Sequence, residues 1–145
     1  MKKFILLRIP IFIYSCTSNS VYINRESDNK QGKILLNKFY KKIANKKFET
    51  VDSMVGDSIK QLSGANGISK TVKFINNKVG NYKSYTIDDH YTRCVTGDNN
   101  QISYNYKLKV TYDKGIIDEI IGFKKQNGSE IKVNSYHANS DLLIH

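Results

Sequence analysis

The sequence lacks the short motifs by which many enzymes are recognised. It contains no glycine-rich phosphate-binding loop, no Cys-X-X-Cys pair and no His-Glu-X-X-His segment. These motifs place backbone amides, thiolates or imidazoles at the spacing that phosphate or metal binding needs. The sequence therefore gives no motif-based reason to expect a cofactor or a bound metal.

Arginine is scarce for a chain with so much positive charge. The formal net charge is +10, from 23 basic and 13 acidic residues, but the only arginines are Arg8, Arg25 and Arg93. Bidentate recognition of phosphate and guanine favours arginine over lysine. We therefore expect no nucleic-acid binding, and we interpret most lysines as a solvated surface.

The sequence also lacks an apolar run long enough to cross a bilayer as a helix. The run from Phe4 to Tyr14 is too short for that, but it follows the basic start Met1-Lys2-Lys3. A basic start, a short apolar run and a small residue form the layout of a secretory signal. Residues 1–15 are therefore predicted to be a signal peptide, the alternatives being an uncleaved anchor or a wrongly assigned start codon.

Cysteine occurs only twice, at positions 16 and 94. The segment Ile13-Tyr14-Ser15-Cys16 resembles the lipobox of bacterial lipoproteins. The resemblance implies cleavage before Cys16 and attachment of lipid to its sulfur, which anchors the chain to a membrane of the cell envelope. Cleavage would remove three basic residues and no acid, so the mature charge would be 20 − 13 = +7. Without lipid, a Cys16–Cys94 disulfide becomes possible in an oxidising compartment.

Residues 16–32 are mostly polar and are predicted to form the lipidated cysteine and a flexible tether. About 16 residues of such coil have an end-to-end distance of roughly 20 Å. From residue 33 the apolar residues recur every three or four positions, which predicts helices. The helical segments expected from this pattern are Ile34–Asn45, Phe48–Val55 and Ile68–Val79.

The C-terminal half alternates apolar and polar residues, as half-buried strands do. The clearest case is Ile102–Tyr112, where we expect the even positions to face a core and the odd ones to face solvent or a partner. Turn sequences such as Asp113-Lys114-Gly115 and Asn127-Gly128 separate the strands. Four strands are predicted, at Tyr82–Val95, Ile102–Tyr112, Ile116–Lys125 and Glu130–His137, with residues 139–145 as a tail.

Helices followed by meandering antiparallel strands predict an α+β domain over residues 33–138. This order resembles the cystatin-like, nuclear-transport-factor-two-like superfamily, and in particular small domains of unknown function on bacterial lipoproteins. The resemblance implies helices packed on a curved four-stranded sheet that encloses a cone-shaped pocket. Enzymes of this superfamily such as ketosteroid isomerases place an acid or a base in that pocket.

The densest titratable cluster is Asp88-Asp89-His90, followed by Arg93 and Cys94. By strand phase Asp89 shares a face with Tyr85, Ile87 and Tyr91, so it is the first candidate for a pocket base.

His137 is the second candidate, in phase with Ile131 and Val133. The simpler interpretations are an Asp89–Arg93 ion pair, a solvated His90 and an inert Cys94. These favour no catalytic residue and no metal site.

The leading hypothesis is a lipid-anchored, non-enzymatic binding or interaction module facing the periplasm or the exterior. Its expected partners are the membrane, through the lipid on Cys16, and a protein or small-molecule ligand. One alternative is a ketosteroid-isomerase-like enzyme that uses Asp89 or His137. Another is an immunity protein that binds a secreted effector, for which the positive charge would suit an acidic partner.

Overall fold

The computed structural model describes residues 18–144, apart from the side chain of Gln126. The predicted signal peptide and the lipidation site Cys16 lie outside the described residues. Within the described residues, no helix is both long enough and apolar enough to span a membrane. The helical elements are α1 (Glu26–Ala44), the 3₁₀ helix η1 (Phe48–Met54), α2 (Asp57–Ser63), α3 (Gly67–Val79) and the 3₁₀ turn η2 (Asp141–Leu143).

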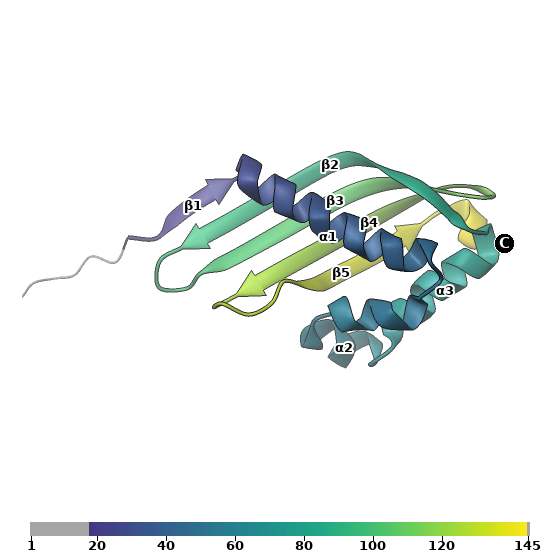
Figure 1. Ribbon diagram of the computed structural model, residues 1–145, viewed down its shortest axis with the longest axis horizontal. Coiled ribbons are helices and arrows are strands. Elements are labelled where there is room, and N and C mark those ends of the chain that lie inside the picture. Colours follow the sequence, from purple (N-terminus) through teal and green to yellow (C-terminus); the bar gives the residue numbers. More distant parts are fainter. Residues whose placement is uncertain (1–17, 145) are drawn as a thin grey trace, which may run out of the picture.

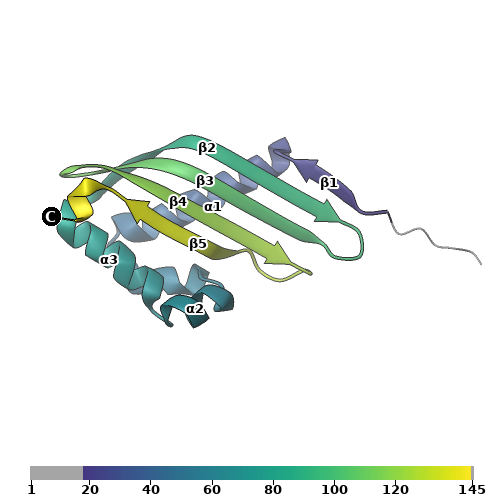
Figure 2. The same cartoon turned by 180° about the vertical axis from the view of Figure 1, so that it is seen from behind.

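The strands form one open antiparallel sheet in the order β1-β2-β3-β4-β5. Helix α1 crosses one face of this curved sheet, while α2 and α3 lie beside β5 (Figure 1). The opposite face carries no helix (Figure 2). The strands are β1 (Ser20–Ile23), β2 (Tyr82–Thr96), β3 (Gln101–Tyr112), β4 (Gly115–Gln126) and β5 (Lys132–Asn139).

The α+β class is confirmed, but the predicted count of four strands is wrong. The additional strand β1 lies within the segment that was expected to be a flexible tether. It pairs with the end of β2, from Ser20 opposite Thr96 to Ile23 opposite Arg93. A free edge of backbone amides and carbonyls favours such pairing even when the added strand is short.

Helix α1 starts at Glu26, two turns earlier than the expected start at Ile34. Its first turn is mostly polar, and it is held by Arg25, whose Nη2 lies 2.9 Å from Oδ1 of Asp28. The Asn24 amide before the helix donates to the Thr92 carbonyl at 2.9 Å. Polar contacts to β2 therefore hold the start of α1 in place, although the sequence there has no apolar residues at helical spacing.

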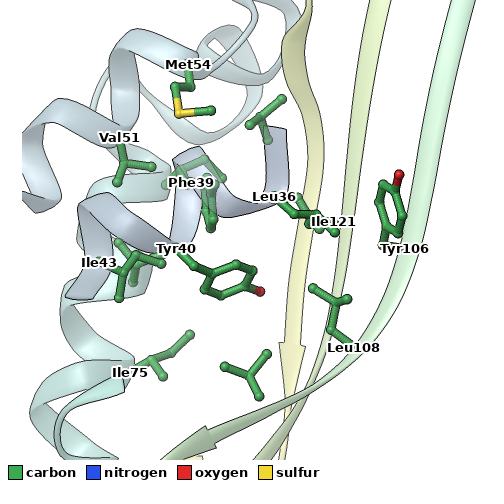
Figure 3. Packing of buried hydrophobic residues seen from close by; sticks show 14 of the residues in the cluster. Leu36, Phe39, Tyr40, Ile43, Val51, Met54, Ile75, Tyr106, Leu108 and Ile121 are labelled. Atoms are coloured by element: carbon green, nitrogen blue, oxygen red, sulfur yellow. The ribbon is translucent and has the colours of Figure 1, made fainter. Parts of the chain in front are cut away.

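The alternation predicted for β3 is confirmed. Tyr104, Tyr106, Leu108 and Val110 are buried under the helices, whereas the odd residues from Asn105 to Lys109 are exposed. Helices and sheet share one hydrophobic core, part of which is shown in Figure 3. The helical contribution to this core comprises Leu36, Phe39, Tyr40, Ile43, Phe48, Val51, Met54, Ile68, Val72, Ile75 and Val79.

The phase predicted for β2 is wrong beyond Ile87. The register between β2 and β3 shifts between Ile87 and Asp89, because β2 contains an extra residue there. Such a bulge turns every later side chain to the opposite face. Ile87 therefore lies opposite the buried Leu108, whereas Asp89 lies opposite the exposed Lys107.

Candidate functional site

The most unusual group in the core is the carboxylate of Glu119, at the centre of β4. Glu119 is 1 % exposed and lies between Ile117 and Ile121, which are fully buried on the same face of the strand. A buried carboxylate is costly unless hydrogen bonds replace the lost water. Its surroundings are therefore the first place to look for chemistry.

Three tyrosine hydroxyls supply these hydrogen bonds. Tyr40 and Tyr136 each donate to Oε2 of Glu119 at 2.8 Å, and Tyr112 donates to Oε1 at 2.8 Å. The donors come from α1, β5 and β3, so four elements meet at one carboxyl group. We call Glu119 with these three tyrosines the tyrosine cage.

Burial dominates the electrostatics of the tyrosine cage. It raises the pKa of Glu119, although the hydrogen bonds from the three tyrosines act in the opposite direction. Burial also raises the pKa of Tyr40, Tyr112 and Tyr136 well above the usual value for tyrosine, and the neighbouring carboxylate raises it further. The cage therefore keeps its tyrosines neutral and able to donate.

The tyrosine cage is sealed by further aromatic rings. The ring of Tyr40 stacks on Tyr82 at a centroid distance of 5.2 Å and packs against Tyr85 at 4.9 Å. Figure 3 shows Tyr40 directed from α1 towards the sheet, with Leu108 on the strand opposite. Tyr40 and Glu119 are each only 1 % exposed, so the carboxylate is closed to solvent. The cage can link elements, but it cannot act as a solvent-accessible base.

The two sequence-predicted candidates, Asp89 and His137, lie on the uncovered face of the sheet. They share one row across it, since Asp89 pairs with Lys107, Lys107 with Ile120 and Ile120 with His137. Three strand spacings of about 4.8 Å place them roughly 14 Å apart. Both are exposed, and the structure does not bring them together.

A shallow hollow of about 110 Å³ lies beside Asp89, between Tyr91, Asn105 and Ile120. The Asp89 carboxylate accepts a hydrogen bond from the backbone amide of His90 at 2.8 Å. His90 itself faces the helix side of the sheet, where its ring is parallel to that of Tyr106 at 6.2 Å. Asp89 and His90 therefore point to opposite faces, and the cluster seen in the sequence does not form one site.

Cys94 is buried on the helix side of β2, and it is a free thiol. The Arg25 guanidinium, which also binds Asp28, lies 3.6 Å from its sulfur. The predicted alternative of a disulfide to Cys16 falls outside the described residues. Across residues 18–144, no group of three or more His, Cys, Asp or Glu side chains is arranged to hold a metal ion.

Sequence reasoning missed the tyrosine cage. The available signal was that Glu119 occurs in phase with Ile117, Ile121 and Phe123, which places a charge on the apolar face of β4. Such a residue requires buried donors, and tyrosines are abundant in this chain. Comparison with known proteins gives no assignment, since no protein family and no curated protein matches the sequence.

Proposed function

We propose that the chain is a lipoprotein of the bacterial cell envelope that acts as a non-enzymatic binding or interaction module. Residues 1–15 would serve as the signal peptide, and lipid on Cys16 would tether the domain to a membrane. The order of helices and strands supports a cystatin-like, nuclear-transport-factor-two-like architecture for the domain.

The sealed tyrosine cage carries the non-enzymatic part of this proposal. In a cone-shaped enzyme, the acid or base must meet a substrate between the helices and the sheet. Here that space is filled by packed side chains, and the Glu119 carboxylate in it accepts hydrogen bonds from three tyrosines. The buried carboxylate of Asp28 is paired with Arg25. The alternative bases, Asp89 and His137, lie on the opposite face of the sheet. They are too far apart to act together as an acid–base pair.

The surface left for contacts is the uncovered face of the sheet. It carries exposed apolar residues, among them Tyr91, Ile116 and Ile120, between charged residues such as Lys107 and Lys109. Such a mixed surface is compatible with a protein contact, because non-obligate interfaces are about as apolar as the rest of a protein surface.

Metabolic labelling with a fatty-acid analogue tests the anchor. The wild-type protein should incorporate the label, and Cys16→Ala should not. Cys94→Ser is the matched control, because it removes the other cysteine and should keep the label. A Cys16→Ala protein that still carries label would overturn the lipoprotein proposal.

A further inference from the structure

Strand β1 exposes three consecutive apolar side chains. Val21 is 50 % exposed, Tyr22 43 % and Ile23 57 %. An exposed apolar edge strand is a site of aggregation unless something covers it. Across residues 18–144, no element packs on the outer side of this strand, which is the free end of the order β1-β2-β3-β4-β5.

The position of β1 in the chain indicates what covers it. Only three residues separate Cys16 from Ser20, the first residue of β1. At no more than about 3.6 Å per residue, Val21 lies within roughly 18 Å of Cys16. A lipid on Cys16 would therefore hold β1 close to the bilayer surface. The 16-residue tether expected from the sequence would instead have held the domain away from that surface.

Other features at the same end of the molecule suit a lipid surface. An apolar hollow of about 150 Å³, lined by Cys94, Val95, Ile102 and Lys125 among others, opens beside the end of β2 that pairs with β1. The Arg25 guanidinium lies 4.8 Å from the centre of the Tyr22 ring. Tyrosine and arginine together are suited to the headgroup layer, because each combines an apolar body with a polar tip.

The opposite end of the domain is distant from this surface. The C-terminal segment and the turn between β3 and β4 lie there, as Figure 1 shows. The separation of the two ends can be counted along β3. Ile23 lies level with Ser103, through Arg93, and Ile116 lies level with Thr111. The eight residue steps from Ser103 to Thr111 along β3 correspond to about 27 Å.

We infer that the domain rests on the membrane through its β1 end, with Val21, Tyr22 and Ile23 in the headgroup layer. This inference depends on the proposed lipid anchor, and it adds a second contact with the same membrane. The C-terminus and the turn between β3 and β4 then face away from the bilayer, and the uncovered face of the sheet stays accessible (Figure 1).

Tryptophan fluorescence tests this orientation, because the natural chain contains no tryptophan. Ile23→Trp places one indole on β1. Ile116→Trp is the matched control, since Ile116 is also a strand isoleucine that is 57 % exposed on the same sheet face. Each full-length lipidated protein would be reconstituted in vesicles of equal parts phosphatidylcholine and phosphatidylglycerol, with and without bromine on the acyl chains near the headgroup.

The Ile23→Trp protein should lose emission in brominated vesicles and shift its emission to shorter wavelengths, and the Ile116→Trp protein should do neither. Co-sedimentation with the vesicles reports the anchor separately. If neither protein sediments with vesicles, the lipid anchor fails and the orientation fails with it. If both sediment but quenching is equal or absent, only the orientation is overturned. Val21→Trp repeats the test should Ile23→Trp not fold.

Discussion

At Glu119, burial and hydrogen bonding act in opposite directions on one carboxyl group. Because burial prevails, the pKa of Glu119 is raised in the folded protein, and the folded state binds the proton more tightly than the unfolded state. The stability that this proton contributes is complete below the ordinary glutamate pKa of 4.5 and is lost as the pH rises through the raised value.

Glu119→Gln should remove this pH dependence. The amide keeps the shape of the side chain and carries no charge to desolvate. Its oxygen accepts from the tyrosine side it faces, and its nitrogen donates to a tyrosine hydroxyl on the other side, whose O–H must turn. We therefore expect the stability of the wild type to fall relative to Glu119→Gln as the pH rises from 4.5 towards neutrality, measured by urea unfolding.

Glu130→Gln provides the control for this experiment. Glu130 is exposed, and its pKa is lowered by the hydrogen bond from Lys132, so any pH effect should have the opposite sign. A difference between wild type and Glu119→Gln that stays constant with pH would show that the buried carboxyl group titrates normally.

Gly32 lies where α1 packs closely against Tyr104 and Tyr106 of β3. A Cβ atom there would collide with the hydroxyl of Tyr106 and lie 2.9 Å from Cδ1 of Tyr104. We expect Gly32→Ala to destabilise the protein by roughly 1–3 kcal/mol through overpacking, despite the better helix propensity of alanine. Thermal or denaturant unfolding measures the loss.

Tyr106→Phe tests the cause of that loss. The Tyr106 hydroxyl is buried and has no hydrogen-bond partner among the described residues, so its removal alone should cost little. In the Tyr106→Phe background, Gly32→Ala should be less harmful than in the wild type, because the nearest colliding atom is gone. Equal costs in the two backgrounds would show that α1 does not approach the sheet at this ring.

Among the strands, β3 offers the sharpest comparison of its two faces. Leu108 is buried against the helices and its neighbour Lys107 is exposed. Leu108→Ala should cost roughly 2–5 kcal/mol by leaving a cavity. Lys107→Ala should stay within about 0.5 kcal/mol. Denaturant melts that give the same midpoint for both variants would contradict the orientation of β3.

Sequence periodicity predicted the elements whose burial follows a simple pattern. Strand β3 and helix α3 each bury one regular set of apolar residues, so their positions were found from the sequence alone. Strand β1 and the first turns of α1 bury almost nothing apolar, and polar contacts to β2 hold them instead. Such contacts between distant segments do not produce a periodic spacing of apolar residues in the sequence.

The candidate site was harder to predict because it depends on register. One extra residue near Asp88 turns the Asp89 side chain to the uncovered face of the sheet. No feature of the β2 sequence predicts that bulge. The tyrosine cage needs the register of β3, β4 and β5 together with the position of Tyr40 on α1. Sequence phase indicates that Glu119 points inward, but it does not identify the three donors.

For the whole molecule, buried tyrosines set the alkaline limit of stability. Burial raises the pKa of Tyr82, Tyr104 and Tyr106 to about 12, from an ordinary value of 10. The folded state therefore favours the neutral phenols, and stability that is complete below pH 10 is lost as the pH rises towards 12.

A spectrophotometric titration at alkaline pH checks this expectation. Most of the tyrosinate absorbance should appear together with the loss of far-ultraviolet circular dichroism, since the buried rings ionise only when the chain unfolds. Complete tyrosinate absorbance from a chain that keeps its circular dichroism would contradict the burial of these rings.

The tyrosine cage has a consequence for how the chain folds. Its carboxylate belongs to β4, and its donors arrive from a helix at the start of the domain, the preceding strand and the last strand. A partly assembled sheet would bury Glu119 with donors missing, which is unfavourable because the unpaired charge is left without water. Intermediates that contain the sheet without α1 should therefore be sparsely populated. The domain should gain its helices and its tertiary packing in one cooperative step, with coincident unfolding curves by far- and near-ultraviolet circular dichroism.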